Sequence, residues 1–383
     1  MIAALAPDLP WHHFTSPLVK WAEQPSFVLG EIMFMICAAL ALVHARREGR
    51  DHLLIWFAAL IAGTANDMIF MALPLVNNFW QAQAMVMITP RLPLYIPCVY
   101  VCFMYYPTVA VRRLGLRPLP LAAATGLLAC LFYAPYDIVG AKFLWWTWHD
   151  TDSPIAVRIL GAPVSSSLWV LTFVSSFGLL VDRALARGAA RGEGTRISAR
   201  TFATGLAMVA GLTTLMMMLQ MTVLQQFDGG TPGYFAFAGG LLIYAIIIVV
   251  RRKTATPEAP RPGDKLLLGA ALFYFAGLIV MMAAFDPASH RSPGVHQEPG
   301  ECYVEVQDVT GATRHQYLCV SDFDEDYDFS CADAPAPGQH WYTVCGRAHE
   351  DFAAWMGGVL LLGVLGSAAF LVLLAGVGRR RNQ

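Results

Sequence analysis

Residues 353–377 read AAWMGGVLLLGVLGSAAFLVLLAGV, and Arg379, Arg380 and Arg381 follow almost directly. The stretch contains no charged residue, and it exceeds the roughly 20 residues that a helix needs to cross the hydrocarbon of a membrane. Lys and Arg stay preferentially on the cytoplasmic side of a membrane. The stretch therefore predicts a transmembrane helix that ends in the cytoplasm.

The rest of the chain has the same character. Its 383 residues are 56% hydrophobic and only 14% charged, and the mean hydropathy is +0.51. A soluble core of this size could not bury so much apolar surface. We therefore predict an all-α, polytopic membrane protein with nine transmembrane helices, at residues 26–45, 53–73, 91–111, 119–136, 162–182, 199–224, 233–250, 266–285 and 353–377.

Basic residues predict the orientation of these helices. The connections that follow the first, third, fifth, seventh and ninth predicted helices contain 19 of the 26 Lys and Arg residues. This alternation predicts a cell-membrane protein with an extracytoplasmic N-terminus and a cytoplasmic C-terminus. The first 25 residues lack a basic start followed by an apolar run, so they are not expected to be a cleavable signal peptide.

The chain divides into four parts on this basis. We expect an extracytoplasmic segment at 1–25, an eight-helix domain at 26–285, a polar extracytoplasmic domain at 286–352, and the last helix with a basic tail at 353–383. The polar domain contains an even set of cysteines, which in an oxidising compartment predicts disulfides. The four are Cys302, Cys319, Cys331 and Cys345, and their spacing leaves three pairings open.

The composition also bears on partners. A net charge of −1 and the lack of a basic patch interleaved with aromatic residues argue against nucleic-acid binding. We expect membrane lipid as the partner, and the 286–352 domain could also bind an extracytoplasmic protein. The sequence identifies no cofactor.

Polar residues inside predicted helices are the candidate site. A charge at the bilayer centre costs about 2.5–3.5 kcal/mol on insertion scales, so its presence calls for a reason. All the candidates fall at the extracytoplasmic side once the topology is fixed, and we expect them to gather in one pocket. They are Glu31, Asn66, Asp67, Arg91, Asp137, Lys142, His149, Asp150, Asp152 and Arg158.

Several of these residues have a purely structural alternative. Glu31 could cap a helix, and Arg91 could be the counter-ion of Asp67 or Glu31. Asn66 and Asp67 lie deeper, about 14 residues into their helix, which favours a function for that pair.

The stretch WWTWHDTD at 145–152 has two interpretations. Trp145, Trp146 and Trp148 are typical of an interfacial aromatic belt, or they form one wall of the pocket. His149 is a candidate for proton transfer because its ordinary pKa lies near neutrality. His149, Asp150 and Asp152 could also contribute metal ligands, although their spacing matches no established metal motif.

Part of the chain resembles a known family. Tyr136-Asp137, Gly140, Trp146-x-Trp148, Gly161-x-Pro163 and Trp169 resemble the carotenoid hydratases, relatives of the small membrane lycopene cyclases. The resemblance covers about residues 136–169 and implies a lipid-accessible polar pocket. The stretch FLWWTWHDTD at 143–152 also resembles an uncharacterised multi-pass membrane family, from which no activity follows.

Three functional hypotheses follow. The first is an enzyme that acts on a lipid or isoprenoid, in which Asp67, Asp137 or Asp150 donates a proton and tryptophan faces stabilise a carbocation. Arg91 and Lys142 would then hold an anionic headgroup.

The second hypothesis is a transporter with Glu31, Asp67 and Asp137 along a proton or cation path. It requires polar residues through the full depth of the membrane, and the inner half is expected to be nearly bare. The third is a receptor or assembly subunit that uses residues 286–352.

Overall fold

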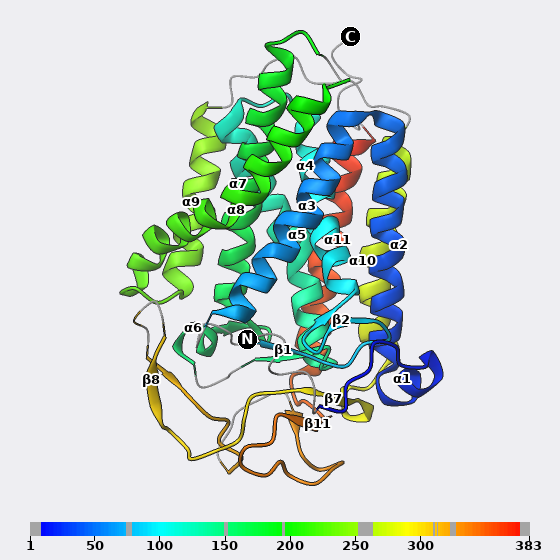
Figure 1. Ribbon diagram of the computed structural model, residues 1–383, viewed down its shortest axis with the longest axis vertical. Coiled ribbons are helices and arrows are strands. Elements are labelled where there is room, and N and C mark those ends of the chain that lie inside the picture. Colours follow the sequence, from blue (N-terminus) through cyan, green and yellow to red (C-terminus); the bar gives the residue numbers. More distant parts are fainter. Residues whose placement is uncertain are drawn as a thin grey trace.

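The computed structural model describes residues 9–73, 79–148, 152–193, 196–251, 263–308, 311, 313–321 and 327–375. The fold is a bundle of long helices with a strand-containing layer at one end (Figure 1). Short α1 (Pro17–Glu23) lies at that end. The long helices are α2 (Pro25–Glu48), α3 (Arg50–Ala72), α4 (Tyr95–Arg112), α5 (Pro118–Lys142), α7 (Val164–Ala189), α8 (Ala199–Leu224), α9 (Tyr234–Arg251), α10 (Asp264–Ala284) and α11 (Phe352–Leu374).

Eight helices of the described chain are long and apolar enough to cross a membrane: all the long helices except α4. Their sequences carry apolar residues on every side, as expected for helices that contact lipid or other helices all round. This confirms a multi-pass, mostly helical protein. We predicted nine apolar spans, and eight helices of the described residues qualify, because α4 is not apolar enough over its length.

Helix α4 differs because it lies inside the bundle. Sixteen of its 18 residues are buried, and its neighbours are α2, α3, α5, α7 and α11. A helix that other helices surround can contain polar side chains that lipid would not tolerate. The helix also begins at Tyr95 and not at residue 91, because β2 (Met87–Thr89) and β3 (Leu92–Pro93) pair just before it.

Helices α8, α9 and α11 lie at the periphery. Only three residues of α9 are buried, and large apolar side chains such as Leu242, Val249 and Leu361 are exposed. Exposed apolar side chains of this number fit a surface that contacts hydrocarbon.

Short strands close one end of the bundle, which we call the strand end. There β1 (Phe79–Gln81) pairs antiparallel with β4 (Trp146–Trp148), and β5 (Arg158–Ile159) pairs with β6 (Ala162–Pro163). Helix α6 (Ser153–Ala156) lies between β4 and β5. The sequence pattern predicted no strands here, so the all-α prediction is corrected at this end, where the strands hold the helix connections together.

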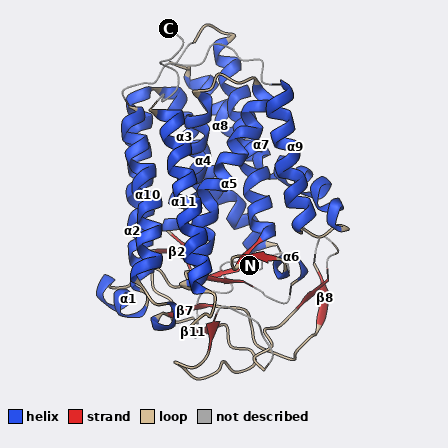
Figure 2. Cartoon of the chain, turned by 180° about the vertical axis from the view of Figure 1, so that it is seen from behind, coloured by secondary structure: helices blue, strands red, loops and turns tan. Residues whose placement is uncertain are grey.

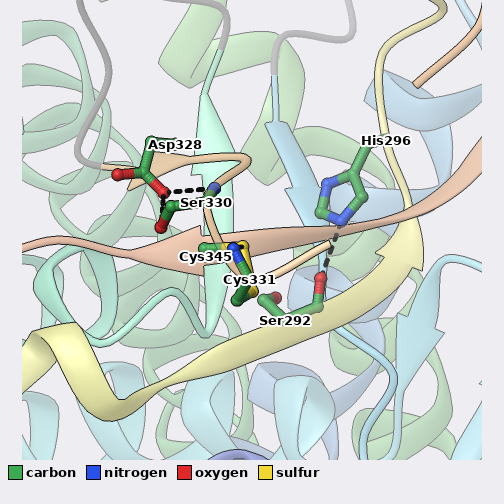
Figure 3. Close-up of a disulfide and its surroundings, with 6 residues drawn as sticks. All are labelled: Ser292, His296, Asp328, Ser330, Cys331 and Cys345. Carbon is green, nitrogen blue, oxygen red and sulfur yellow. Dashed lines mark hydrogen bonds between the residues drawn. A yellow bond between two sulfur atoms is a disulfide. The ribbon is translucent and has the colours of Figure 1, made fainter. Parts of the chain in front are cut away.

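Residues 286–352, which we call the disulfide segment, cover the strand end (Figure 2). Strand β11 (Trp341–Gly346) lies between β7 (Arg291–Val295) and β10 (Tyr327–Asp328), and β8 (Glu305–Gln307) pairs with β9 (Thr313–His315). The four cysteines form Cys302–Cys319 and Cys331–Cys345. The predicted disulfides are therefore present, and Figure 3 shows the bond that joins Cys331 to β11.

Hydrogen bonds attach the disulfide segment to the bundle. His290 Nε2 lies 2.8 Å from Ser26 Oγ, and Ser292 Oγ donates to the Leu144 carbonyl at 2.9 Å. His296 Nδ1 lies 3.3 Å from Thr147 Oγ1, and its Nε2 lies 3.1 Å from the Ser292 carbonyl (Figure 3). The segment therefore fixes the 143–148 connection from outside.

Candidate functional site

Glu31 of α2 anchors a loop at the strand end. Its two carboxylate oxygens accept the backbone N–H of Met85 at 2.9 and 3.1 Å, and the side chain is 1% exposed. The buried ammonium of Lys20 interacts electrostatically with it, and desolvation lowers the pKa of Lys20 to about 8. These contacts favour the structural alternative for Glu31, because they hold the α3–α4 connection against α2.

Asp67 and Asn66 of α3 face Tyr100 of α4. The Tyr100 hydroxyl donates to Asp67 Oδ1, and Asn66 Nδ2 lies 3.5 Å from the same hydroxyl oxygen. Thr214 of α8 donates to Asn66 Oδ1 at 3.1 Å. The polar pair that the sequence singled out is thus buried and joins three helices.

Arg91 lies between β2 and β3, near Asp67. Its Nη2 donates to the Phe79 carbonyl at 3.1 Å, and its guanidinium lies 5.8 Å from the centre of the Trp80 ring. Burial lowers the pKa of Arg91 to about 10, while the charge of Asp67 acts in the opposite direction. Arg91 therefore supplies positive charge to this end of the bundle.

Asp137 of α5 is the most isolated acid among the described residues at this end. It is fully buried, and no hydrogen bond of ordinary geometry reaches either carboxylate oxygen within the described chain, although two hydroxyls lie close enough to interact with it. The hydroxyls of Ser166 and Tyr133 are its polar neighbours. A buried polar group without a well-formed hydrogen bond is uncommon in folded proteins and points to a missing ligand, water or chemical role.

Asp67 and Asp137 share a neighbour. Tyr133 interacts electrostatically with both carboxyl groups and with Tyr95, whose hydroxyl donates to Gln81 Oε1 at 2.8 Å. Tyr95 in turn interacts with Glu31 and Asp67. We call Glu31, Asp67, Asp137, Tyr95, Tyr100 and Tyr133 the acidic cluster. Its members come from α2, α3, α4 and α5, and only the three acids are among the residues that the sequence singled out.

Trp145 and Trp146 cover the acidic cluster. Trp145 is fully buried, donates from Nε1 to Ser26 Oγ at 3.0 Å, and stacks on Phe27 with ring centres 5.7 Å apart. Trp146 lies 4.9 Å from the Tyr136 ring. With Trp148 8% exposed, all three tryptophans pack inside the protein.

Two glycines admit these rings. A Cβ on Gly30 would lie 2.4 Å from the Trp145 ring, and one on Gly140 would lie 2.0 Å from the Trp146 ring. Leu144, just before the tryptophans, has a φ of 55°, a left-handed conformation that is uncommon outside glycine. The Trp145 and Trp146 rings, which we call the tryptophan wall, therefore pack closely against the backbone of α2 and α5 because glycine occupies positions 30 and 140.

Other predicted residues lie in separate contacts. Lys142 Nζ lies 2.8 Å from the centre of the Trp355 ring, and Arg158 lies 5.9 Å from the Trp148 ring. Asp152 accepts a hydrogen bond of 2.7 Å from Arg314 Nη1, while Arg314 Nε donates to Asp308 at 2.6 Å. The single pocket that the sequence predicted thus does not include these three residues in its centre, because neighbouring segments already bind them.

His149 and Asp150 lie outside the described residues, so the structure does not place these two predicted catalytic residues. Within the described part of the chain, no group of three or more His, Cys, Asp or Glu side chains is arranged to hold a metal ion.

The chain matches the model of one protein family, described as "Domain of unknown function (DUF7802)", over residues 11–375. The chain belongs to this family. No curated protein and no solved structure matches it. Residues 11–375 take in the whole bundle and the disulfide segment, so the family model treats the two as one unit.

The sequence pattern of this DUF7802 chain did not reveal a second polar cluster at the opposite end of the bundle. His44 of α2 and His52 of α3 are 0% and 2% exposed, and their rings lie 5.6 Å apart. Arg113 and Asp264 form a bidentate pair nearby, with bonds of 3.0 and 2.7 Å. We call this end the histidine end. These four residues lie at or next to the ends of α2, α3, α4 and α10.

A sequence signal for this cluster exists but is weak. Asp51 and His52 are adjacent at the start of a helix, where polar residues ordinarily face solvent. Arg113 and Asp264 are 151 positions apart, and each follows or begins an apolar stretch. Only the packing of α4 against α2 and of α2 against α10 brings them together.

Proposed function

We propose that this protein is an integral membrane enzyme that acts on a lipid or isoprenoid through acid–base chemistry in the acidic cluster. Asp137 is the proposed proton donor, and Asp67 is the second acid. The single observation that supports this proposal most is Asp137, a fully buried carboxyl group whose polar neighbours in the described chain are the hydroxyls of Ser166 and Tyr133.

The surroundings of Asp137 support the same chemistry. An apolar environment favours the neutral form of a carboxyl group, which is the form that can donate a proton. Protonation of an alkene leaves a carbocation, and aromatic faces stabilise cations by roughly 0.5–2 kcal/mol each. Tyr136, Trp145 and Trp146 supply such faces next to the cluster. The resemblance of residues 136–169 to carotenoid hydratases is consistent with an isoprenoid substrate.

The position of Arg91 supports the proposal that the substrate has an anionic headgroup. It lies near Asp67, and planar guanidinium groups bind phosphates and carboxylates with two parallel hydrogen bonds. Lys142, with its ammonium against Trp355, is the second proposed contact. His149 and Asp150, outside the described residues, remain proposed participants in proton transfer.

The membrane arrangement belongs to the same proposal. Helix α4 is proposed as the ninth span, with the strand end and the disulfide segment extracytoplasmic and the histidine end cytoplasmic. The alternation of basic residues and the two disulfides support this orientation. Single-cysteine variants at exposed positions of each end, labelled in intact cells with a membrane-impermeant maleimide, test it: labelling at the histidine end would reverse the orientation.

Asp137→Asn is the decisive variant for the enzyme proposal. In a strain that lacks the chromosomal gene, wild-type protein should restore a lipid species that mass spectrometry detects, and Asp137→Asn and Asp67→Asn should not. Asp182→Asn is the matched control, because Asp182 lies in α7 and pairs with Arg112 at 3.6 Å far from the acidic cluster. A lipid profile that Asp137→Asn restores fully would refute the proposal.

A further inference from the structure

An exposed apolar surface lies at the strand end, where α1 projects from the bundle beyond the start of α2 (Figures 1 and 2). Most of it comes from residues 14–21, and the exposed fractions are 77% for Phe14, 82% for Leu18, 52% for Val19 and 45% for Trp21. Ile88 of β2 is 44% exposed. Phe14 bridges to Val86, and side chains two positions apart in a strand share a face, so Ile88 lies on the same side as Phe14.

Polar contacts fix one side of α1 to the bundle. Lys20 is fully buried, and its ammonium donates to Gln24 Oε1. Gln24 is also fully buried, and its Nε2 donates to the carbonyls of Phe143 and Leu144 at 3.1 and 2.7 Å. Because these contacts hold the helix in place, its exposed apolar side chains are presented in a fixed position outside the bundle.

The exposed part of this stretch contains no Lys, Arg, Asp or Glu. Within residues 12–22, all of which the structure describes, the exposed residues are His12, His13, Phe14, Ser16, Pro17, Leu18, Val19, Trp21 and Ala22. The basic residue of α1, Lys20, is buried, and Glu23 Oε2 lies 3.7 Å from its ammonium. Contiguous exposed apolar side chains mark an interaction surface. The partner that fits this surface is apolar, and it needs no charge of either sign.

The place of α1 in the fold identifies that partner as the surface of the bilayer. Helix α2 begins directly after α1 and is one of the helices apolar enough to cross a membrane. With 24 residues it is roughly 36 Å long, which exceeds the roughly 30 Å of hydrocarbon, so its ends reach the headgroup regions. Leu29 and Ile32, near its start, are 36% and 40% exposed. The apolar surface of α1 therefore adjoins the part of α2 that contacts hydrocarbon, at the level where tryptophans such as Trp21 are enriched.

We propose that the exposed side chains of residues 14–21, together with Ile88, are a lipid-binding surface that lies at the boundary between headgroups and acyl chains. Apolar helix faces enter this boundary by about 5–10 Å. Because no exposed Lys or Arg accompanies the surface, binding depends on apolar insertion and not on anionic headgroups. Gln24 connects α1 to residues 143 and 144, which precede the tryptophan wall, so lipid binding holds that wall at a fixed depth in the bilayer.

Quenching by brominated lipids tests the surface. The full-length Leu18→Cys protein is labelled with an environment-sensitive fluorescent maleimide and reconstituted into vesicles of phosphatidylcholine brominated either near the headgroup or deep in the acyl chains. Emission of the label should shift to shorter wavelength than in water, and the shallow bromines should quench it more than the deep ones. Both leaflets contain the brominated lipid, so the result is the same for either orientation of the protein. Wild-type protein taken through the same labelling gives the background from its own cysteines.

Two labelled positions serve as references. Val364→Cys, near the middle of α11 and 55% exposed, should be quenched more by the deep bromines. Ala334→Cys, exposed in the disulfide segment, should be quenched by neither. A Leu18 label quenched no more than the Ala334 label would overturn the proposal. A shift to shorter wavelength without quenching would also overturn it, because a second copy of the chain would then cover this face. Val19→Cys, 52% exposed, is the second variant if Leu18→Cys does not elute as a single species.

The charge of the lipid tests the mode of binding. Replacement of part of the phosphatidylcholine by phosphatidylglycerol, at low or high salt, should leave quenching of the Leu18 label unchanged. Quenching that requires phosphatidylglycerol would overturn the role of apolar insertion. The measurement needs no turnover of a lipid. Quenching at residue 18 therefore supports the surface even if the lipid profile of Asp137→Asn shows that the enzyme proposal is wrong.

Discussion

The two ends of the bundle bury polar groups in opposite ways. At the histidine end a bidentate Arg113–Asp264 pair neutralises charge, and histidines lie against it. At the strand end Asp137 has only hydroxyl neighbours, and Asp67 accepts from a tyrosine. Buried charges persist when they are paired, whereas an unpaired acid is best accommodated as its neutral form. Buried charge is therefore paired with an opposite charge at the histidine end, whereas the acids of the strand end have tyrosine and serine hydroxyls as neighbours.

The ends also differ in what holds them together. Long helices meet directly at the histidine end, while the strand end depends on short strands, two disulfides and hydrogen bonds from the disulfide segment. Changes at the two ends should therefore affect stability differently. Removal of a charge should destabilise the histidine end, whereas low pH, loss of a disulfide and added side-chain volume should destabilise the strand end.

Arg113→Ala should have the largest effect of any single substitution considered. It removes the bidentate partner of the buried Asp264 carboxylate, and breaking a buried ion pair typically destabilises a protein by about 3–5 kcal/mol. Arg112→Ala is the matched control, because Arg112 and Asp182 are each about a fifth exposed and lie 3.6 Å apart, and such pairs contribute roughly 0–1 kcal/mol. Thermal unfolding in detergent measures both. Equal losses for the two variants would contradict the view that the histidine end depends on a buried pair.

Acidification should next destabilise the strand end. Burial lowers the pKa of His290 and His296 to about 4, from an ordinary value of 6.5. Between these values the unfolded state binds protons that the folded state excludes. Stability therefore falls as the pH drops from about 6.5 to about 4, by about 3 kcal/mol for each histidine, and is insensitive to these groups above that range.

The pH effect has a direct measurement. Hydrogen exchange in the disulfide segment should quicken as the pH is lowered through this window, after correction for the intrinsic pH dependence of exchange. His296→Gln should reduce the stability slope by roughly half, since each histidine contributes up to about 1.4 kcal/mol per pH unit. His12→Gln is the control and should leave the slope unchanged. A pH-independent stability of the segment would show that these histidines do not fasten it.

Loss of the Cys331–Cys345 disulfide should come third. The two cysteines are 14 positions apart in the sequence, and the entropy of closing such a loop corresponds to about 3 kcal/mol. The Cys331→Ser/Cys345→Ser double variant should lower the unfolding midpoint of the disulfide segment and leave exchange at the histidine end unchanged. Equal loss of protection at both ends would mean that the two ends unfold as one unit.

The sequence predicted the helices well and the connections poorly. The predicted stretch 26–45 corresponds to Pro25–Glu48, and 233–250 corresponds to Tyr234–Arg251, because continuous apolar composition identifies a span without knowledge of its neighbours. The strands could not be predicted in this way. They are two to six residues long, and β1 finds its partner β4 more than 60 positions later, through pairing that no local pattern encodes.

The candidate site was partly predictable for the same reason. Asp67 and Asp137 stand out because they are acids within apolar stretches, and in the structure Tyr133 interacts electrostatically with both. Tyr133 and Tyr100 do not stand out, since tyrosine is common in membrane helices. His44 and His52 lie near helix ends, where polar residues are expected to be exposed, and only the packing of three helices buries them.

Gly140→Ala should have the smallest effect of the four, confined to the strand end. The added Cβ would lie 2.0 Å from the Trp146 ring, so the ring must move away from Tyr136. Overpacking of this kind costs about 1–3 kcal/mol. Gly211→Ala in α8 is the matched control, because nothing lies within 4 Å of its Cβ position, and helix propensity predicts a gain of roughly 0.5–1 kcal/mol. Tryptophan fluorescence and the unfolding midpoint distinguish the two variants. If Gly140→Ala leaves both unchanged, Trp146 does not depend on close approach at Gly140, and the tryptophan wall is more adaptable than the acidic cluster behind it.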